Sequence, residues 1–162
     1  MSTEFQCMQV SIQNKQRKFQ LDEKRVLDWT RIILSMQKIH HGEISLVFVN
    51  NRRIRIFNKA YRFVDRPTNV LAFPMREGPG GALHPFFLGD VMISLEMVKK
   101  EARLYRRTWD EQLLILLIHG ILHLLGYDHT RSAREEARMM RREKWIFNRI
   151  HTQDRTMAPE TH

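Results

Sequence analysis

The sequence contains a single cysteine, Cys7, among 162 residues, so no disulfide can form within the chain. It also lacks a hydrophobic run long enough for a membrane span: the uncharged stretch 112–127 is shorter than the ~20 residues needed and contains two histidines. The first residues include Glu4 and no apolar segment of the kind found in secretory signals. These shortages argue against a disulfide-stapled or membrane-spanning protein, and we expect a cytoplasmic one.

Acidic residues are also in short supply relative to basic ones. The chain has 27 Lys and Arg against 18 Asp and Glu, which gives a formal net charge of +9. Such an excess favours a polyanionic partner, either nucleic acid or an anionic membrane surface. The length suits one domain, which would bury about two-thirds of the surface of its unfolded chain.

Three histidines, His119, His123 and His129, lie within eleven residues. The apolar run 113–118 before them predicts a buried helix, on which His119 and His123 share one face because they are four residues apart. Gly126 is typical of the left-handed residue that follows a helix, so the chain can return His129 toward the other two. Three imidazoles with a fourth position left open are the ligands of catalytic zinc, although such donors also suit iron, copper or nickel.

The histidine spacing matches the long zinc-protease motif, but Gly120 stands where a protease has its glutamate general base. Glycine in a helix interior costs about 1 kcal/mol relative to alanine, so a reason for it is expected. Three reasons are open. The glycine makes room for a bulky substrate, removes a charge that would repel a phosphodiester, or allows close helix packing.

The histidine segment resembles the YbeY family of single-domain bacterial endoribonucleases, whose motif H-G-x-L-H-L-x-G-Y-D-H is met at every fixed position. Residues 58–74 are similar throughout to a second family motif, N-x-x-[YF]-R-x-x-D-x-P-T-[DN]-V-L-[SA]-F-P. This resemblance implies that Arg62 takes part in RNA cleavage, a role that suits a guanidinium because its donors match phosphate oxygens. Without the resemblance, Arg62 would be interpreted as one solvated cation among several.

The resemblance implies further properties. The activity would be that of a single-strand-specific, zinc-dependent endoribonuclease, a hydrolase of phosphoric ester bonds. It would act in ribosomal RNA processing, including maturation of the 16S rRNA 3′ end, and in ribosome quality control. One Zn²⁺ would be held by His119, His123 and His129. The expected partners are RNA, in particular ribosomal RNA, and the small ribosomal subunit, with no membrane and no DNA specificity.

Secondary-structure patterns predict an α+β fold with one small, four-stranded mixed sheet, about five helices and a zincin-like histidine helix. We expect residues 1–150 to form a single YbeY-type metal-dependent endoribonuclease domain and residues 151–162 to be a disordered tail. The expected strands are 5–12, 43–50, 70–73 and 88–94, the second of them central because it is continuously apolar. The expected helices are 22–39, one capped by Asn51, 95–106, one opened by a Thr108–Glu111 capping box, and one opened by Ser132 and Glu135 that ends near Ile150.

The predicted mechanism is metal-assisted hydrolysis of RNA, in which Arg62 stabilises the charge developing on the phosphate. The proton acceptor stays open between metal-activated hydroxide, Asp128 and a group of the substrate. Asp90 has two open interpretations, orienting a metal-binding histidine or capping a turn. The loop 75–87 is open between a lid and a plain connection.

Two rival functions remain open at this point. One is a metallopeptidase, favoured by the histidine spacing and disfavoured by Gly120. The other is a non-catalytic RNA- or ribosome-binding module with a zinc-stabilised fold. Charged residues on the last helix, together with the basic segment 52–66, are candidates for an RNA-contacting surface.

Overall fold

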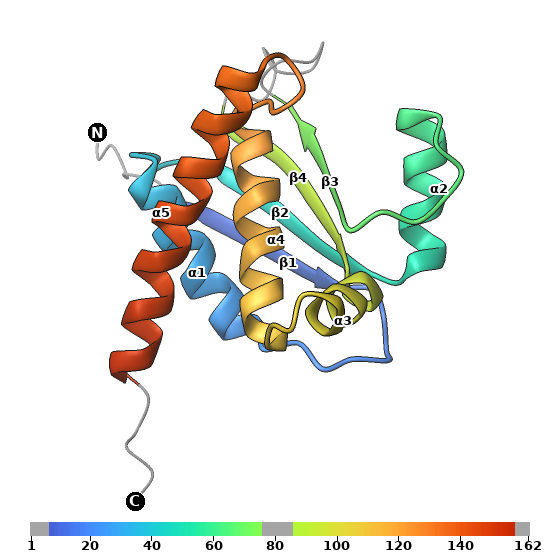
Figure 1. The fold of residues 1–162 in the computed structure, drawn as a ribbon, viewed down its shortest axis with the longest axis horizontal. Coiled ribbons are helices and arrows are strands. Elements are labelled where there is room, and N and C mark those ends of the chain that lie inside the picture. The colour runs from blue at the N-terminus through green and yellow to red at the C-terminus, as the bar shows by residue number, and fades with distance from the viewer. Residues whose placement is uncertain (1–6, 76–85, 158–162) are drawn as a thin grey trace, which may run out of the picture.

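The computed structural model describes residues 7–75 and 86–157, which fold in the predicted order and confirm the α+β class. Figure 1 shows the arrangement. The strands are β1 (Gln9–Asn14), β2 (Glu43–Val49), β3 (Val70–Pro74) and β4 (Phe87–Ser94). The helices are α1 (Glu23–Met36), α2 (Asn51–Arg62), α3 (Leu95–Leu104), α4 (Trp109–Leu124) and α5 (Ala133–Met157).

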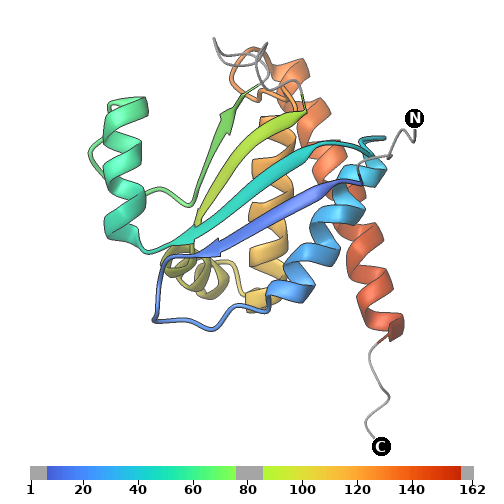
Figure 2. The same ribbon diagram turned by 180° about the vertical axis from the view of Figure 1, so that it is seen from behind.

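The four strands form one mixed sheet in the order β1-β2-β4-β3. β1, β2 and β4 run parallel, whereas β3 pairs antiparallel with β4 and forms an edge of the sheet. β2 is central, as its continuous apolar run predicts. Figures 1 and 2 show that α1, α4 and α5 cover one face, while α2 stands on the other side of the sheet.

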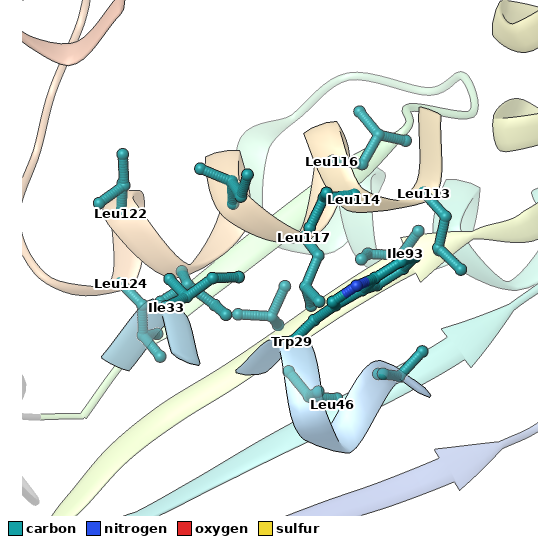
Figure 3. Packing of buried hydrophobic residues seen from close by; sticks show 14 of the residues in the cluster. Trp29, Ile33, Leu46, Ile93, Leu113, Leu114, Leu116, Leu117, Leu122 and Leu124 are labelled. Atoms are coloured by element: carbon teal, nitrogen blue, oxygen red, sulfur yellow. The ribbon is translucent and has the colours of Figure 1, made fainter. Parts of the chain in front are cut away.

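The main core lies between the sheet and α4, which is buried along most of its 16 residues. Its leucines pack against Trp29 and Ile33 of α1, Leu46 of β2 and Ile93 of β4 (Figure 3). Full burial of one such side chain contributes roughly 1.5–3 kcal/mol, so many buried positions hold this helix firmly against the sheet. Any side chain on its last turns is therefore carried on a rigid support.

The cap of α2 is Asn50, not the predicted Asn51. The side chain of Asn50 accepts a hydrogen bond of 2.9 Å from the backbone N–H of Arg53. Asn51 is the first helical residue, and its side-chain oxygen accepts a 2.6 Å bond from the hydroxyl of Ser94. Asn50 and Asn51 both have side chains that can cap a helix. The bond from Ser94 of β4 engages the side chain of Asn51, so Asn50 forms the cap.

The last helix continues to Met157, so the predicted end at Ile150 is wrong, and the first part of the expected tail is helical. Contacts with other helices explain this extension. The indole N–H of Trp29 donates to Asp154 at 3.0 Å, and Nε2 of His151 lies 3.3 Å from a carboxylate oxygen of Glu111. Residues 158–162 lie outside the described part of the chain.

The remaining element ends differ from the prediction by a few residues. β1 is displaced toward the C-terminus, because its register pairs Gln9 with Glu43 and Asn14 with Phe48 of β2. Residues 1–6 and most of the predicted loop 75–87 fall outside the described residues. Within the described ranges, no helix combines the length and the apolar character that crossing a membrane requires.

Candidate metal centre and cleft

The end of α4 and the turn after it place the three histidines. The predicted capping box is present: the Thr108 hydroxyl accepts from the Glu111 backbone N–H, and the Glu111 carboxylate accepts from that of Thr108. At the other end, the backbone N–H of Tyr127 donates to the carbonyl of Leu122. Gly126 between them has φ of 98°, a left-handed conformation that favours glycine. This turn reverses the chain after α4, as its sequence predicts.

The three imidazoles converge on one point. His119 Nε2 and His123 Nε2 are 3.0 Å apart, and His123 Nε2 and His129 Nδ1 are 3.1 Å apart. One nitrogen from each ring lies within 4.8 Å of the other two. Ligand nitrogens of a tetrahedral zinc site are about 3.4 Å from one another, given Zn–N distances near 2.0–2.1 Å. The donor set and its spacing therefore fit a single divalent ion with a nitrogen preference.

Glu143 of α5 lies behind the first histidine. The Nδ1–H of His119 donates to Oε1 of Glu143 at 2.5 Å, and both side chains are partly buried. A proton on Nδ1 leaves the lone pair on Nε2, the nitrogen that faces His123. Carboxylates commonly fix metal-binding histidines in this way. The arrangement therefore presets the tautomer that metal binding requires.

The sequence pattern does not single out Glu143, which sits in a helix rich in charges of both signs. One signal points to it nonetheless. It lies four residues after Met139 and three before Ile146, both fully buried, so it belongs to the apolar face of α5. A carboxylate on an apolar face requires a partner, and here the partner is His119.

His123 is the central ligand candidate and is held in its neutral form. Burial, followed by the neighbouring His119 and His129, lowers the pKa of His123 from 6.5 to about 4. A neutral imidazole is the form that binds metal. The surroundings of His123 therefore keep its nitrogen available for coordination even in mildly acidic solution.

A cleft of about 450 Å³ opens beside the histidines. Arg62, at the last turn of α2, lines the same cleft and is exposed. It makes no ion pair with any residue in the described ranges, so its charge is available to a ligand. The described lining contains no aspartate or glutamate, and it consists of Arg62, Thr68, Asn69, Val70, Leu71, Ala72, Pro74, His119, Gly120, His123, His129 and Thr130.

Gly120 allows α4 to approach the sheet closely. A Cβ atom at this position would lie 2.6 Å from Cγ1 of Val91 and 2.9 Å from Cγ2 of Val70. Both distances are shorter than non-bonded carbon atoms tolerate, so a glutamate would fit only if the two valine side chains or the helix moved. Of the three reasons open for this glycine, close packing is the one that the structure shows.

Asp90 does not orient a histidine. It lines a different cavity, beside Phe73 and Met92 on the α2 side of the sheet. Its carboxylate makes no hydrogen bond or ion pair with any residue that the structure describes, so neither role suggested for Asp90 is found. Glu143 occupies the place behind the histidines instead.

Asp128 stabilises the turn that carries His129. Its Oδ1 accepts hydrogen bonds from the backbone N–H of Thr130 at 2.8 Å and from the hydroxyl of the same residue at 2.6 Å. Its Oδ2 lies 3.3 Å from Nε of Arg131. These bonds, those of Thr130 first, lower the pKa of Asp128, which makes this carboxylate a weak proton acceptor.

Comparisons with known proteins agree with one another. The family model described as Endoribonuclease YbeY matches residues 11–151. A relative with that name from Geobacter metallireducens is 43% identical over 141 residues, which cover 86% of this chain and 94% of the relative. Another, from Aquifex aeolicus, is 36% identical over 149 residues, covering 92% of this chain and 96% of the relative.

A solved structure supports the same fold. A solution structure of a protein from Thermotoga maritima superposes with a TM-score of 0.62 over 94% of this chain and 99% of that one. Its sequence is 23% identical, so this likeness bears on the fold alone. The family match spans both the histidine helix and the arginine that lines its cleft, and the chain therefore belongs to the YbeY family of endoribonucleases.

Proposed function

We propose that this protein is a zinc-dependent endoribonuclease that hydrolyses phosphodiester bonds of single-stranded RNA. One observation carries the proposal: three imidazole nitrogens converge in a cleft that an unpaired arginine also lines and whose described walls carry no carboxylate. Such a cleft suits an anionic substrate. Its volume is within the range of sites that hold small ligands, which is adequate for one nucleotide.

His119, His123 and His129 would hold one Zn²⁺. No fourth histidine, cysteine or carboxylate joins this group within the described ranges, as expected of a catalytic rather than a structural site. When bound, the ion supplies Lewis-acid activation of the phosphate and of the nucleophile. Glu143 holds the imidazole of His119 with its Nε2 lone pair directed inward.

Arg62 would bind the scissile phosphate. Its guanidinium offers a planar set of donors to two phosphate oxygens. The negative charge on the phosphoryl oxygens grows toward the transition state, so this contact strengthens as the bond breaks. The phosphate is held between Arg62 and the histidines, while Asp128 keeps the turn with His129 in place.

We assign the protein to ribosomal RNA processing, including the 3′ end of 16S rRNA, and to ribosome quality control, with the small ribosomal subunit as partner. Two family motifs met at every fixed position and the net charge of +9 support this assignment. A cytoplasmic location would give access to this substrate. We place the whole activity in a single domain, within which α5 reaches Met157.

The objection to the metallopeptidase alternative becomes stronger. A metallopeptidase needs a general base beside the metal, and the close approach of Val91 leaves no space for a side chain at Gly120 unless the valine or the helix moves. No other carboxylate lines the described part of the cleft. The non-catalytic alternative expects a structural zinc site closed by four protein ligands, whereas three ligand candidates meet in the described part of the chain.

The test is incubation of zinc-loaded protein with a fluorescent single-stranded RNA and, in parallel, with a duplex of the same sequence and with casein. We expect cleavage of the single strand only, inhibition by a chelator, and a steep loss of activity between about 50 and 500 mM salt. His119→Ala should be inactive and Arg62→Ala strongly impaired, and circular dichroism should show both variants folded. Intact RNA with zinc-loaded wild type would overturn the proposal.

A further inference from the structure

The outer face of α5 carries a row of cations. With 100° between successive residues of a helix, these side chains fall on one side of it, centred about 120° around the axis from the buried Met139, Ile146 and Ile150. We call this row the α5 basic stripe; its members are Arg134, Arg138, Arg141, Trp145 and Arg149. All five are exposed. No acidic residue lies among them.

The charges of this stripe are not neutralised within the molecule. None of its four arginines forms an ion pair with a carboxylate in the parts of the chain that the structure describes. Exposed arginines on helices often pair with a glutamate one turn away. Here Glu143 pairs with His119 and Glu111 with His151, while Glu135 and Glu136 form no ion pair with the described arginines of the stripe. An unpaired row of this kind favours binding to a polyanion.

An aromatic ring stands in the middle of the row. Trp145 is 51% exposed, although burial of an indole is strongly favourable. The guanidinium of Arg142 lies 5.0 Å from the centre of its ring, and that of Arg138 lies 5.1 Å from the ring of Tyr127. Each contact places a guanidinium over an aromatic ring. Cations interleaved with exposed aromatic rings are typical of surfaces that bind single-stranded nucleic acid.

The stripe begins beside the metal centre. α5 starts at Ala133, shortly after His129, and then runs the length of α4 away from the cleft (Figure 1). From Arg134 to Arg149 the helix rises about 22 Å, at about 1.5 Å per residue. A strand held in the cleft can therefore continue along this face and meet a cation at almost every turn.

A lipid surface is the weaker candidate for the same charges. Helices that lie on membranes insert a broad apolar face into the lipid. The apolar face of α5 is already used, because Met139, Ile146 and Ile150 are 0–1% exposed in the core. The large apolar side chains that α5 leaves exposed, Met140, Trp145 and Met157, point to different sides of the helix and form no continuous apolar face. The side that carries Trp145 is cationic, which suits phosphates and an unpaired base.

We propose that the α5 basic stripe binds the single-stranded RNA that leads into or out of the cleft, as an extended site outside the catalytic one. The arginines contact successive phosphates, and Trp145 stacks on an unpaired base. This inference rests on the proposed function, because it takes RNA as the substrate. It adds that affinity for long RNA depends on α5, whereas cleavage of an oligonucleotide that fills only the cleft does not.

The test compares two triple variants of the full chain. Arg134→Gln/Arg138→Gln/Arg141→Gln removes three stripe cations. Lys99→Gln/Lys100→Gln/Arg103→Gln removes three exposed cations of α3 and changes the net charge equally. Binding is measured by fluorescence anisotropy with an uncleaved RNA of about 20 nucleotides, using His119→Ala as the common background.

We expect the stripe variant to bind this RNA at least about tenfold more weakly, and the slope of log K against log salt to fall by about 2, since each single-strand phosphate contact contributes about 0.7. Trp145→Ala should weaken binding by about tenfold, and Trp145→Phe by much less, because stacking tolerates either ring. The α3 variant should stay close to wild type. Equal losses in both triple variants, or no loss in either, would overturn the proposal. The proposal would also be overturned if the stripe variant lost binding to vesicles that contain anionic lipid but kept its binding to RNA.

Cleavage of a short oligonucleotide separates this inference from the proposed function. In the active background, the stripe variant should cleave it at the wild-type rate. If wild type fails to cleave any RNA, the proposed function fails, and the two binding results still decide whether α5 holds RNA. If wild type cleaves and the stripe variant binds long RNA normally, only the extended site is refuted.

Discussion

Glu143 offers the sharpest test of the metal centre, since it touches a ligand candidate without belonging to the ligand set. Glu143→Gln keeps the size of the side chain and removes its charge. The carboxylate oxygen is 2.5 Å from Nδ1 of His119, and the side chains are 27% and 31% exposed, so water weakens but does not remove the effect. Without the carboxylate, the proton of His119 is free to occupy Nε2, where the metal needs a lone pair.

The expected magnitude follows from this geometry. Loss of a residue that supports a metal-binding histidine typically costs 10- to 100-fold in metal affinity, about 1.4–2.7 kcal/mol. The partial exposure of the pair places Glu143→Gln near the lower end, about tenfold, and Glu143→Ala, which removes the acceptor altogether, higher. Glu136→Gln is the matched control, because Glu136 lies on the same helix, is exposed, and its side chain forms no hydrogen bond or ion pair with described residues.

The assay is zinc titration against a chromophoric chelator, together with nitrogen NMR of the His119 ring in metal-free protein. Wild type and Glu136→Gln should show Nδ1 protonated and the same zinc affinity. Glu143→Gln should show a mixture of tautomers and weaker binding. Unchanged affinity and tautomer in Glu143→Gln would refute the reasoning, because Glu143 would then only fill its place in the helix interface.

Three further predictions concern other residues of the site. Arg62→Ala should lower the rate of RNA cleavage by about 10²- to 10³-fold at unchanged zinc affinity. Arg62→Lys should recover only part of the lost rate, because an ammonium lacks the planar fork of donors. Equal activity of Arg62→Ala and wild type would exclude a role of Arg62 in binding the phosphate. The pKa of His123 is lowered from 6.5 to about 4 in the folded state, so the unfolded chain binds the extra proton. The metal-free protein should therefore lose stability as pH falls from about 6.5 to 4, and acid unfolding followed by circular dichroism should show a weaker dependence in His123→Asn. Gly120→Ala should lower the free energy of unfolding by about 1 kcal/mol, since overpacking at about 1–3 kcal/mol outweighs a helix-propensity gain of about 1 kcal/mol. Urea denaturation measures this change, and Val91→Ala in the same chain should restore part of the lost stability. A Gly120→Ala variant more stable than wild type would contradict the close-packing explanation.

The order of elements and the meeting of the histidines are predictable because both depend on local pattern. Four-residue spacing on a buried helix and a left-handed glycine two residues after it suffice to bring three rings together. The capping box at Thr108 is similarly local and is present as predicted. Arg62 differs, because nothing in its immediate neighbours distinguishes it from the other cations of α2, and only the family motif singles it out.

Features that depend on tertiary packing escape such reasoning. Glu143 lies 24 positions from His119, on another helix, so its partner is visible only once α5 is docked. The extension of α5 past Ile150 depends on Trp29, from the first third of the chain. The need for glycine at position 120 arises from Val91 of β4, which no periodicity of α4 reveals.

Because His129 lies outside α4, binding of a metal ion at the three histidines should affect residues beyond the site itself. Two rings stand on a helix fixed by the core, but His129 is exposed and belongs to the connection between α4 and α5. An ion bound by all three would link α4 to that connection, and part of its binding free energy would go into ordering residues 125–132. Backbone amides from Tyr127 to Thr130 should thus exchange with deuterium more slowly once the ion is present.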